Sequence, residues 1–515
     1  MCVLRKIGVM KKSIGLIVGI AAFLALLLIP IDPTLLPPLA RYAAAVTVLM
    51  AVFWITQPIP MEATALIPIV AFPLLGILTP AEATAPYADK VIFLFLGGFI
   101  IAMSMQRWGL HKRIALKIIN ITGTSPRRLV LGFMIATAFL SMWMSNTATA
   151  MMMIPIAIAI IATVLPTKVY KDMTPEHKAF AGCIVLSVAY AAGVGGIATL
   201  IGTPANGILI AQMETLFPGA PSIDFFTWLK FGIPLLLIFI PVMWLWLTRV
   251  AYRKMPKVLD HAKEALEHEV AALGPMSRGE KNTLFVFVFT AFCWIFAKNK
   301  DFGSFTIPGL EMIFPGIDDS TIAILGALLL FLIPISWKKH EFTMNWEWAV
   351  KIPWGILLLF GGGMCLSAAF IKSGLAQAIV GYFSVLNGVP IILLVLIIAV
   401  VVMLMTEVTS NTAIASVMMP ILAVTALSLQ VNPWILMMTA AVCSSFAFML
   451  PVATPPNAIA YGTEYVEMKD MINAGWALNL LGIMVFTILL FTIVLWAFGI
   501  SIELPAWAAT STIPI

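Results

Sequence analysis

The chain has 515 residues, of which 61% are hydrophobic and only 10% are charged. Soluble domains carry about 25% charged residues, so this composition excludes a soluble globular protein. The formal net charge is +6, and in a membrane protein an excess of Lys and Arg sets the orientation and does not indicate a nucleic-acid partner. The composition therefore predicts an all-α polytopic membrane protein that binds no nucleic acid.

Eleven apolar runs are long enough to cross a bilayer, which predicts about eleven transmembrane helices. We interpret the first run as an uncleaved N-terminal helix, because it ends at Pro30 and not at the small residues of a signal-peptide cleavage site. The runs cover residues 13–30, 41–56, 62–79, 91–106, 179–201, 227–248, 282–297, 321–337, 353–371, 434–452 and 472–499.

Two further apolar stretches, residues 128–166 and 390–430, are interrupted midway by Ser-Asn-Thr. Irregular backbone at membrane depth is tolerated only where it is buried in protein or lines a cavity. We therefore expect each stretch to form a re-entrant helical hairpin, which returns to the side of the membrane that it entered. Amphipathic segments that begin at His111 and Leu375 are expected to lie along the interface as short helices that support the hairpins.

The distribution of basic residues tests this topology, because Lys and Arg collect in cytoplasmic loops. With the N-terminus inside and both hairpins re-entrant, 24 of the 30 Lys and Arg residues fall on the cytoplasmic side. The count predicts a multi-pass protein of the cell (inner) membrane with a cytoplasmic N-terminus and a C-terminus outside. The longest polar segment, from Arg249 to Lys281, is interpreted as a solvated connector that contains a helix.

An internal repeat relates the two halves of the chain. Adding 265 to a position in the first half brings Ser145–Thr147 onto Ser410–Thr412. Further along, with a shorter spacer, Gly202–Asn206 resembles Ala453–Asn457. An odd number of crossings separates the two copies, so they have opposite orientations in the membrane. Inverted repeats of this kind are typical of secondary transporters, whose sites lie at the midplane where broken helices of the two halves meet.

The repeated residues are polar, whereas a repeat that served only packing would be apolar, which indicates that the repeat builds a site. The predicted organisation follows from it. It comprises an N-terminal helix (1–40), a first inverted repeat (41–250) with a hairpin at about 128–166 and a broken helix at about 179–215, a cytoplasmic connector (251–281), a second inverted repeat (282–500) with a hairpin at about 390–430 and a broken helix at about 434–468, and a C-terminal tail (501–515).

The repeated segments offer hydroxyls, amides and free backbone groups, with no Lys or Arg in their middle. Such oxygen atoms suit a hard cation such as sodium, while helix N-termini and Asn or Thr donors suit a carboxylate. A neutral site can bind a cation and an anion together, because each offsets the charge of the other. Of the nearby carboxylates, Glu62 is expected at the membrane interface, and Glu407 is interpreted as a structural hydrogen-bond acceptor in preference to a coupling carboxylate.

All five histidines fall in predicted cytoplasmic loops. An intramembrane hydrolase that pairs Ser with His would therefore lack its general base. The sequence predicts a protein that is not an enzyme.

At these motifs the chain resembles the divalent anion/sodium symporter family, which moves di- and tricarboxylates such as succinate, malate, fumarate or citrate. Two departures are Gln57, where the resemblance leads us to expect an acidic residue, and Ala205, where the second repeat has Pro456. We expect Gln57 to lie away from the site. The matching elements extend over roughly residues 40 to 500 and are Trp54–Pro60, Ser145–Thr147, Ile201–Asn206, Trp354–Gly363, Ser410–Thr412 and Met449–Asn457.

The resemblance implies two sodium sites, a homodimer and an elevator movement of a transport domain against a scaffold. The first sodium site is implied at Ser141, Ser145, Asn146 and the backbone of Gly202, and the second at Thr406, Thr409, Asn411 and the backbone of Ala453. The substrate carboxylates are implied at Asn146, Thr147, Thr203, Pro204, Asn411, Thr412, Thr454 and Pro455.

Together, the repeat and the resemblance predict a secondary active transporter that couples sodium to the symport of divalent anions. The favoured cargo is a C4-dicarboxylate (succinate, malate or fumarate) or citrate. A sodium-independent dicarboxylate exchanger on the same fold stays open as the alternative, with a sulfate transporter or an anion channel less favoured.

Overall fold

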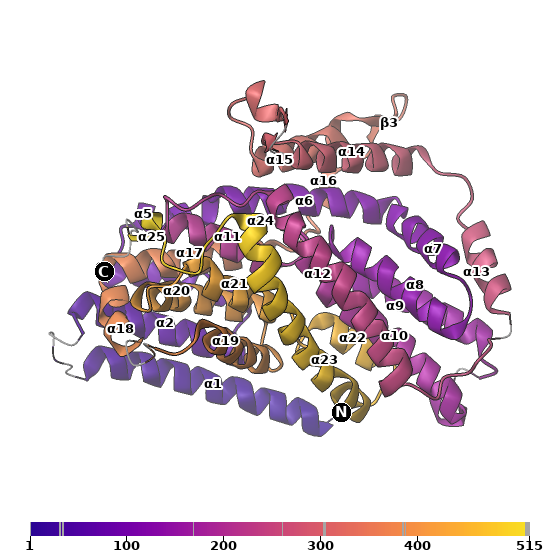
Figure 1. The fold of residues 1–515 in the computed structure, drawn as a ribbon, viewed down its shortest axis with the longest axis horizontal. Coiled ribbons are helices and arrows are strands. Elements are labelled where there is room, and N and C mark those ends of the chain that lie inside the picture. Colours follow the sequence, from indigo (N-terminus) through magenta and orange to yellow (C-terminus); the bar gives the residue numbers. More distant parts are fainter. Residues whose placement is uncertain are drawn as a thin grey trace.

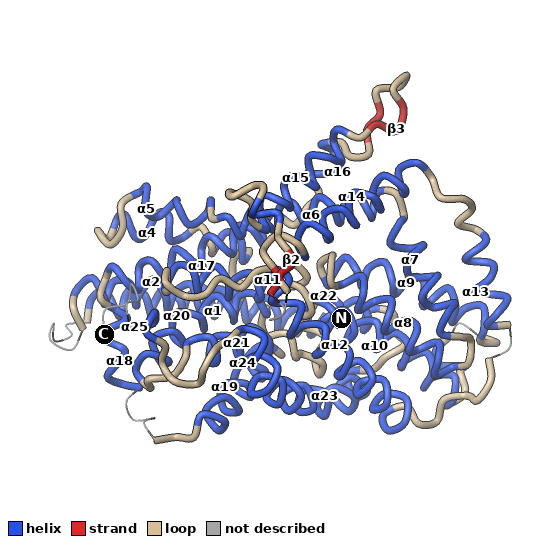
Figure 2. The backbone as a smooth tube through the Cα atoms, turned by 45° about the horizontal axis from the view of Figure 1, so that its top comes forward, coloured by secondary structure: helices blue, strands red, loops and turns tan. Residues whose placement is uncertain are grey.

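The computed structural model describes residues 2–29, 32, 36–167, 169–259, 261–301, 305–383, 386 and 388–509. Within these residues the chain is built of helices, and its strands form two short antiparallel pairs, β1 (Lys300–Asp301) with β2 (Thr306–Ile307) and β3 (Pro334–Ser336) with β4 (Glu341–Phe342). The β3–β4 pair projects from the helical body (Figure 2).

The first half of the chain and the connector form thirteen helices within the described residues. They are α1 (Cys2–Leu28), α2 (Pro38–Thr56), α3 (Met61–Thr64), α4 (Ile67–Leu74), α5 (Pro80–Thr84), α6 (Lys90–Arg107), α7 (Leu110–Thr122), α8 (Pro126–Ser141), α9 (Asn146–Val164), α10 (Pro175–Ile197), α11 (Pro204–Leu216), α12 (Phe225–Trp246) and α13 (Ala262–Ala271).

The second half follows the same plan. It contains α14 (Arg278–Ile295), α15 (Asp319–Leu332), α16 (Trp346–Ala349), α17 (Trp354–Lys372), α18 (Leu375–Phe383), α19 (Ile391–Thr406), α20 (Asn411–Ser428), α21 (Pro433–Cys443), α22 (Pro455–Gly462), α23 (Met468–Leu489), α24 (Leu495–Phe498) and α25 (Ala506–Ala509). Short 3-10 helices at Ala85–Ala88, Tyr170–Asp172 and Leu310–Met312 and π-helical turns at Leu247–Ala251 and Leu490–Val494 complete the described helices.

Eight helical segments in the described part of the chain are long and apolar enough to cross a membrane, and several shorter apolar helices accompany them. Two of the eight are α9 and α20, which are the second arms of the predicted hairpins. The predicted run 62–79 is divided into α3 and α4, and the run 434–452 is helical only as far as Cys443. The chain is therefore a helical membrane protein, and the number of crossings stays a prediction.

Both apolar stretches with a central Ser-Asn-Thr are interrupted where the sequence predicts. In the first, Ser145 has extended backbone angles (φ −60°, ψ 144°), and its hydroxyl accepts a hydrogen bond from the Ala148 amide at 3.3 Å. Ser is a strong helix N-cap because its oxygen satisfies an amide that has no partner within the helix. Ser410 has similar extended angles before α20, so both second arms begin at an Asn.

Both broken helices restart at a Thr-Pro pair. Pro204 and Pro455 occupy the first turn of α11 and α22, where a missing amide hydrogen costs nothing. The freed carbonyls of each break are satisfied by an Asn side chain: Asn206 Nδ2 lies 2.7 Å from Thr199 O, and Asn457 Nδ2 lies 2.8 Å from Ala447 O. Each break is therefore held by the helix that follows it.

The two halves interlock through these broken helices. The segment after the second break, α22, packs against α9 and α10 of the first half, whereas α11, after the first break, packs against α20 and α21 of the second half. Figure 1 shows the resulting body, with α14 and α15 along one long edge beside α6 and with α1 along the opposite edge. The exchange brings both hairpin tips and both breaks to the centre.

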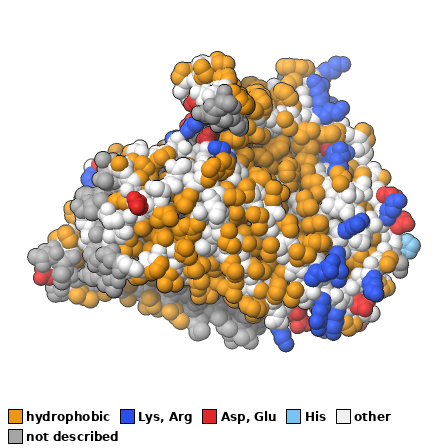
Figure 3. Space-filling view, in the orientation of Figure 1, with side chains coloured by type: hydrophobic (Ala, Val, Ile, Leu, Met, Phe, Trp, Pro, Cys, Tyr) orange, Lys and Arg blue, Asp and Glu red, His pale blue; other side chains and the backbone are white. Residues whose placement is uncertain are grey.

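The two short helices expected beside the hairpins are present. α7 packs against α8, and α18 packs against α20. The predicted helix of the connector is α13, which packs against α7 and α9. Arg113 of α7 ties this region to α14, because its Nε lies 2.6 Å from Glu280 Oε1. The surface in Figure 3 is a broad apolar face with Lys and Arg gathered toward one edge.

Candidate functional site

A cavity of about 530 Å³ lies where the two hairpin tips and the two broken helices meet. Its wall brings together segments that are far apart in the sequence. The lining residues are Gln57, Met61, Glu62, Ser145, Asn146, Thr147, Thr203, Pro204, Ile356, Leu359, Ser410, Asn411, Thr412, Pro451, Val452, Ala453, Thr454, Pro455, Pro456 and Ala458.

Four helix N-termini converge on this cavity. Their first residues, Asn146 of α9, Pro204 of α11, Asn411 of α20 and Pro455 of α22, all belong to its lining. The N-terminus of a helix carries free amide groups and the positive end of the helix dipole, so it attracts anions. The wall is therefore suited to an anion, although its described residues include no Lys or Arg.

Behind the first hairpin tip, oxygen atoms gather around a glycine. Ser141 Oγ lies 2.8 Å from both Asn146 Oδ1 and Ala192 O. A Cβ placed on Gly196 would lie 2.4 Å from Asn146 Oδ1 and 3.1 Å from Gly202 O, so the missing side chain leaves the space that these oxygens face. Oxygen ligands from hydroxyl, amide and backbone groups are those that a hard cation prefers.

The second tip repeats this arrangement. Thr406 Oγ1 lies 2.5 Å from Asn411 Oδ1 and 2.7 Å from Ser444 O. Thr406 and Ser141 are related by the offset of 265, so the sequence repeat is also a repeat of geometry. The Thr409 hydroxyl is buried and donates to Trp54 O at 3.2 Å, which joins the second tip to the end of α2.

The structure places the predicted site residues in two layers. The eight residues expected to hold substrate all line the cavity, together with Ser145 and Ala453 from the expected sodium ligands. The other four expected sodium ligands lie behind this lining and are buried: Ser141, Gly202, Thr406 and Thr409. The roles of these residues stay predictions, while their convergence is a property of the fold.

Gln57 corrects one expectation, because it lines the cavity and does not lie away from it. Glu62 is half-buried in the same wall, and its expected place at the membrane interface stays a prediction. The reason is a sharp corner between α2 and α3: Gln57 has left-handed backbone angles (φ 50°), and the Thr409–Trp54 hydrogen bond draws this corner to the second tip. The Pro-Ile-Pro that interrupts an apolar stretch was the signal available in the sequence.

Glu407 holds the second break and does not line the cavity. Its carboxylate accepts hydrogen bonds from the amides of Met449 and Leu450, both at 2.9 Å, and from Asn479 Nδ2 at 2.6 Å. Three donors on one buried carboxylate favour the structural acceptor over the coupling carboxylate. At the equivalent place in the first half, the Thr199 hydroxyl donates to Met142 O.

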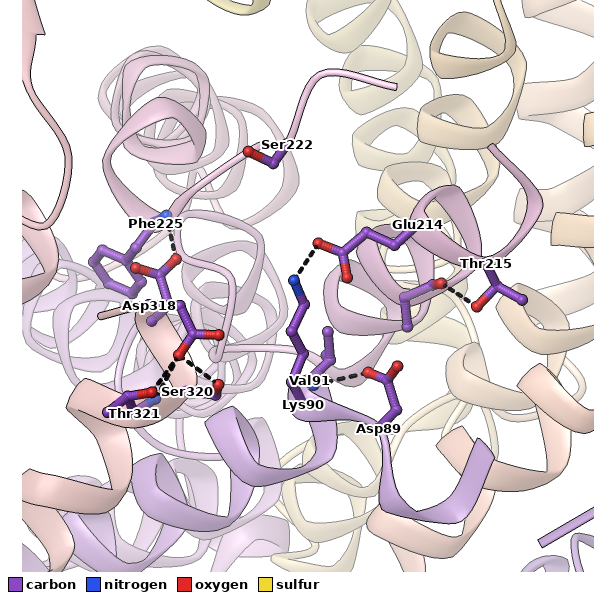
Figure 4. A network of polar contacts seen from close by, with 12 residues as sticks. Asp89, Lys90, Val91, Glu214, Thr215, Ser222, Phe225, Asp318, Ser320 and Thr321 are labelled. Atoms are coloured by element: carbon purple, nitrogen blue, oxygen red, sulfur yellow. Dashed lines mark hydrogen bonds and ion pairs between the residues drawn. The ribbon is translucent and has the colours of Figure 1, made fainter. Parts of the chain in front are cut away.

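A second cavity, of about 260 Å³, lies where α6, α11, α12 and α15 approach one another. Figure 4 shows Lys90 paired with Glu214, whose Oε1 lies 3.0 Å from Lys90 Nζ, and Asp318 bound to the start of α15. The lining holds two Lys against four Asp or Glu residues. This excess of acidic groups disfavours an anion, so the cavity between the hairpin tips is the candidate site.

Comparison with known proteins agrees with this geometry. The family model of the sodium:sulfate symporter transmembrane region matches residues 10–502. The sodium-dependent dicarboxylate transporter SdcS of Staphylococcus saprophyticus is 40% identical over 500 residues, which cover 96% of this chain and 93% of that protein. SdcS of Staphylococcus aureus strain MRSA252 is 41% identical over 495 residues, with 96% and 93% covered.

Two solved structures share the fold at low sequence identity. MtrF of Neisseria gonorrhoeae, which is described with a class of antimetabolite efflux pumps, superposes with a TM-score of 0.56 at 12% identity over 92% of this chain and 96% of that one. The YdaH transporter of Alcanivorax borkumensis gives 0.56 at 15% identity over 84% and 88%. With these transporter folds, and with a family match along nearly its whole length, the chain belongs to the sodium:sulfate symporter family, which confirms the resemblance to divalent anion/sodium symporters.

Proposed function

We propose that this protein is a sodium-coupled symporter of divalent anions, with a C4-dicarboxylate such as succinate, malate or fumarate, or citrate, as its favoured cargo. The observation that carries the proposal is the single cavity on which four helix N-termini and two matching oxygen clusters converge. The similarity to relatives that are sodium-dependent dicarboxylate transporters supports the same cargo and the same cation.

In this proposal the site has two units, each formed by one hairpin and the broken helix that follows it, and each unit holds one sodium ion. The first ion binds among Ser141, Ser145, Asn146 and the backbone of Gly202, and the second among Thr406, Thr409, Asn411 and the backbone of Ala453. The cargo carboxylates lie against the lining layer formed by Asn146, Thr147, Thr203, Pro204, Asn411, Thr412, Thr454 and Pro455. Cation and anion enter together because an isolated charge in an apolar surrounding costs several kcal/mol.

The proposal extends to how the protein sits and moves in the membrane. Re-entrant hairpins, the two inverted repeats, a homodimer and an elevator movement are all parts of it. The packing of α7 on α8 and of α18 on α20 supports it, because each short helix links a hairpin to the rest of its half. The gathering of Lys and Arg toward one edge supports a cytoplasmic N-terminus in the cell (inner) membrane (Figure 3).

Uptake of labelled succinate into vesicles that contain the purified protein tests this function. We expect uptake to rise with an inward sodium gradient and to fall sharply in Asn146→Ala and in Asn411→Ala. Asn120→Ala is the matched control, because Asn120 lies exposed on α7 and should leave uptake unchanged.

Three other outcomes would replace the proposal. Uptake that ignores sodium but needs dicarboxylate inside the vesicle would indicate an exchanger on the same fold. Uptake of sulfate in preference to every carboxylate would indicate a sulfate transporter, the activity in the family description. An uncoupled anion conductance would indicate a channel.

A further inference from the structure

Among the described residues that line the candidate cavity, Glu62 is the one ionisable side chain. It is half-buried, and within the described part of the chain it has no ion-pair partner or hydrogen bond. The neighbouring Gln57 does not satisfy it, because the Gln57 amide points toward the sulfur of Met61 at 3.6 Å. A free carboxylate thus stands in a wall that otherwise attracts anions.

The fold holds this carboxylate in place. The indole of Trp54 donates to Met61 O at 3.2 Å, which fixes the start of α3, and α3 packs against α17. On α17, a Cβ at Gly355 would lie 2.3 Å from Glu62 Cγ and 2.4 Å from its Oε1, so the absence of a side chain there leaves room for Glu62 in this position. The next residue, Ile356, lines the cavity beside it.

A carboxylate at this position opposes the other electrostatic features of the site. Four helix N-termini, together with any bound cations, favour the anion that carries most negative charge. A fixed negative charge in the same cavity repels the cargo in proportion to its charge. We propose that Glu62 is a specificity-determining residue that makes the cavity prefer dianions over trianions, an inference that rests on the proposed function.

The expected size of the effect follows from Coulomb repulsion between Glu62 and the cargo. Two unit charges about 10 Å apart repel each other, and the effective dielectric constant around them lies between those of water and the protein interior. This repulsion lowers affinity roughly fivefold for each negative charge on the cargo. Removal of the Glu62 charge should therefore help a trianion more than a dianion, and a dianion more than a monoanion.

The test compares three related anions in vesicles, at a fixed sodium concentration and at a pH at which every carboxyl is ionised. The anions are monomethyl succinate with one charge, succinate with two and propane-1,2,3-tricarboxylate with three. For Glu62→Gln, we expect the ratio of the KM for the tricarboxylate to the KM for succinate to fall roughly fivefold. Glu62→Asp keeps the charge and should keep the wild-type ratio, and Glu176→Gln, exposed at the start of α10, is the matched control.

An unchanged KM ratio in Glu62→Gln, with wild-type uptake intact, would overturn the inference and leave the proposed function standing. A rise in KM for all three anions together with a higher sodium requirement would also overturn it, because Glu62 would then bind a cation. Wild-type vesicles that take up none of these anions with sodium would contradict the proposed function itself.

Discussion

The two hairpin tips share one arrangement, but the breaks behind them are built from different chemistry. At both tips a hydroxyl lies between an Asn side chain and a backbone carbonyl, from Ser141 in the first half and from Thr406 in the second. Preservation of this pattern in both halves of the chain indicates that the tips carry the shared task of the two halves. The supporting contacts have diverged.

The first break makes space by omitting side chains, whereas the second is fixed by a carboxylate. Gly196 and Gly202 leave the oxygens of the first unit room, and the equivalent positions of the second half are Ala447 and Ala453. Glu407 anchors two amides and Asn479 in the second unit, where the first uses the hydroxyl of Thr199. The first unit should therefore be sensitive to added volume, and the second to lost charge.

The largest effect is expected for Gly196→Ala. The new methyl group would lie 2.4 Å from Asn146 Oδ1, well inside van der Waals contact, and would occupy the space that the first oxygen cluster faces. Overpacking of this kind costs about 1–3 kcal/mol, so sodium-dependent uptake should fall by roughly 5-fold to 150-fold. The initial rate of uptake into vesicles measures this loss, and Ala447→Gly is the matched change in the second unit. Equal losses of uptake in both variants would contradict the proposed difference between the two units.

A smaller effect, on stability, is expected for Glu407→Gln. The new Gln side chain retains one oxygen acceptor but turns its NH₂ group toward a backbone N–H donor. One buried backbone N–H group therefore loses its hydrogen-bond acceptor. Hydrogen bonds to charged groups contribute about 1.5–3 kcal/mol and neutral ones about 1 kcal/mol, so this variant should lower thermal stability more than Thr199→Val. Thermal unfolding in detergent compares the two, and a larger loss in Thr199→Val would contradict the assignment.

The smallest effect is expected when the hydroxyl residues of the two tips are exchanged. Ser141→Thr and Thr406→Ser each keep the hydroxyl that contacts the Asn and the carbonyl. Uptake in each variant should stay within about fourfold of wild type, since loss or gain of one methyl group alters packing by about 0.8 kcal/mol. Ser141→Ala and Thr406→Val remove the hydroxyl and provide the contrast. If the exchanges were as harmful as the removals, the hydroxyls would not be the shared element.

The tips and breaks could be predicted from the sequence because polar residues inside apolar stretches have few physical explanations. Ser145–Thr147 and Ser410–Thr412 mark the tips, and the Thr-Pro pairs mark the restarts of α11 and α22. The part that Gln57 and Glu62 play in the wall could not be predicted in this way. Their place depends on a corner drawn to the second tip by the Thr409–Trp54 hydrogen bond, a contact between residues far apart in the sequence.

The same limit applies to charge and to helix length. Scarcity of charge in the hairpins and broken helices predicts a wholly neutral site, and the structure adds Glu62 to its wall from outside those segments. The run 434–452 is apolar throughout, yet α21 ends at Cys443 because Glu407 and Asn457 bind the backbone that follows. A hydropathy pattern does not predict such contacts, since they form only when the two halves interlock.

The central claim is that both units hold a cation while one anion occupies the cavity between them. The direct test counts labelled sodium and labelled succinate that enter the same vesicles of wild-type protein. The matching oxygen clusters at Asn146 and Asn411 predict that succinate brings in at least two sodium ions per molecule, one for each unit. Entry of a single sodium ion per succinate, or of succinate without sodium, would contradict it.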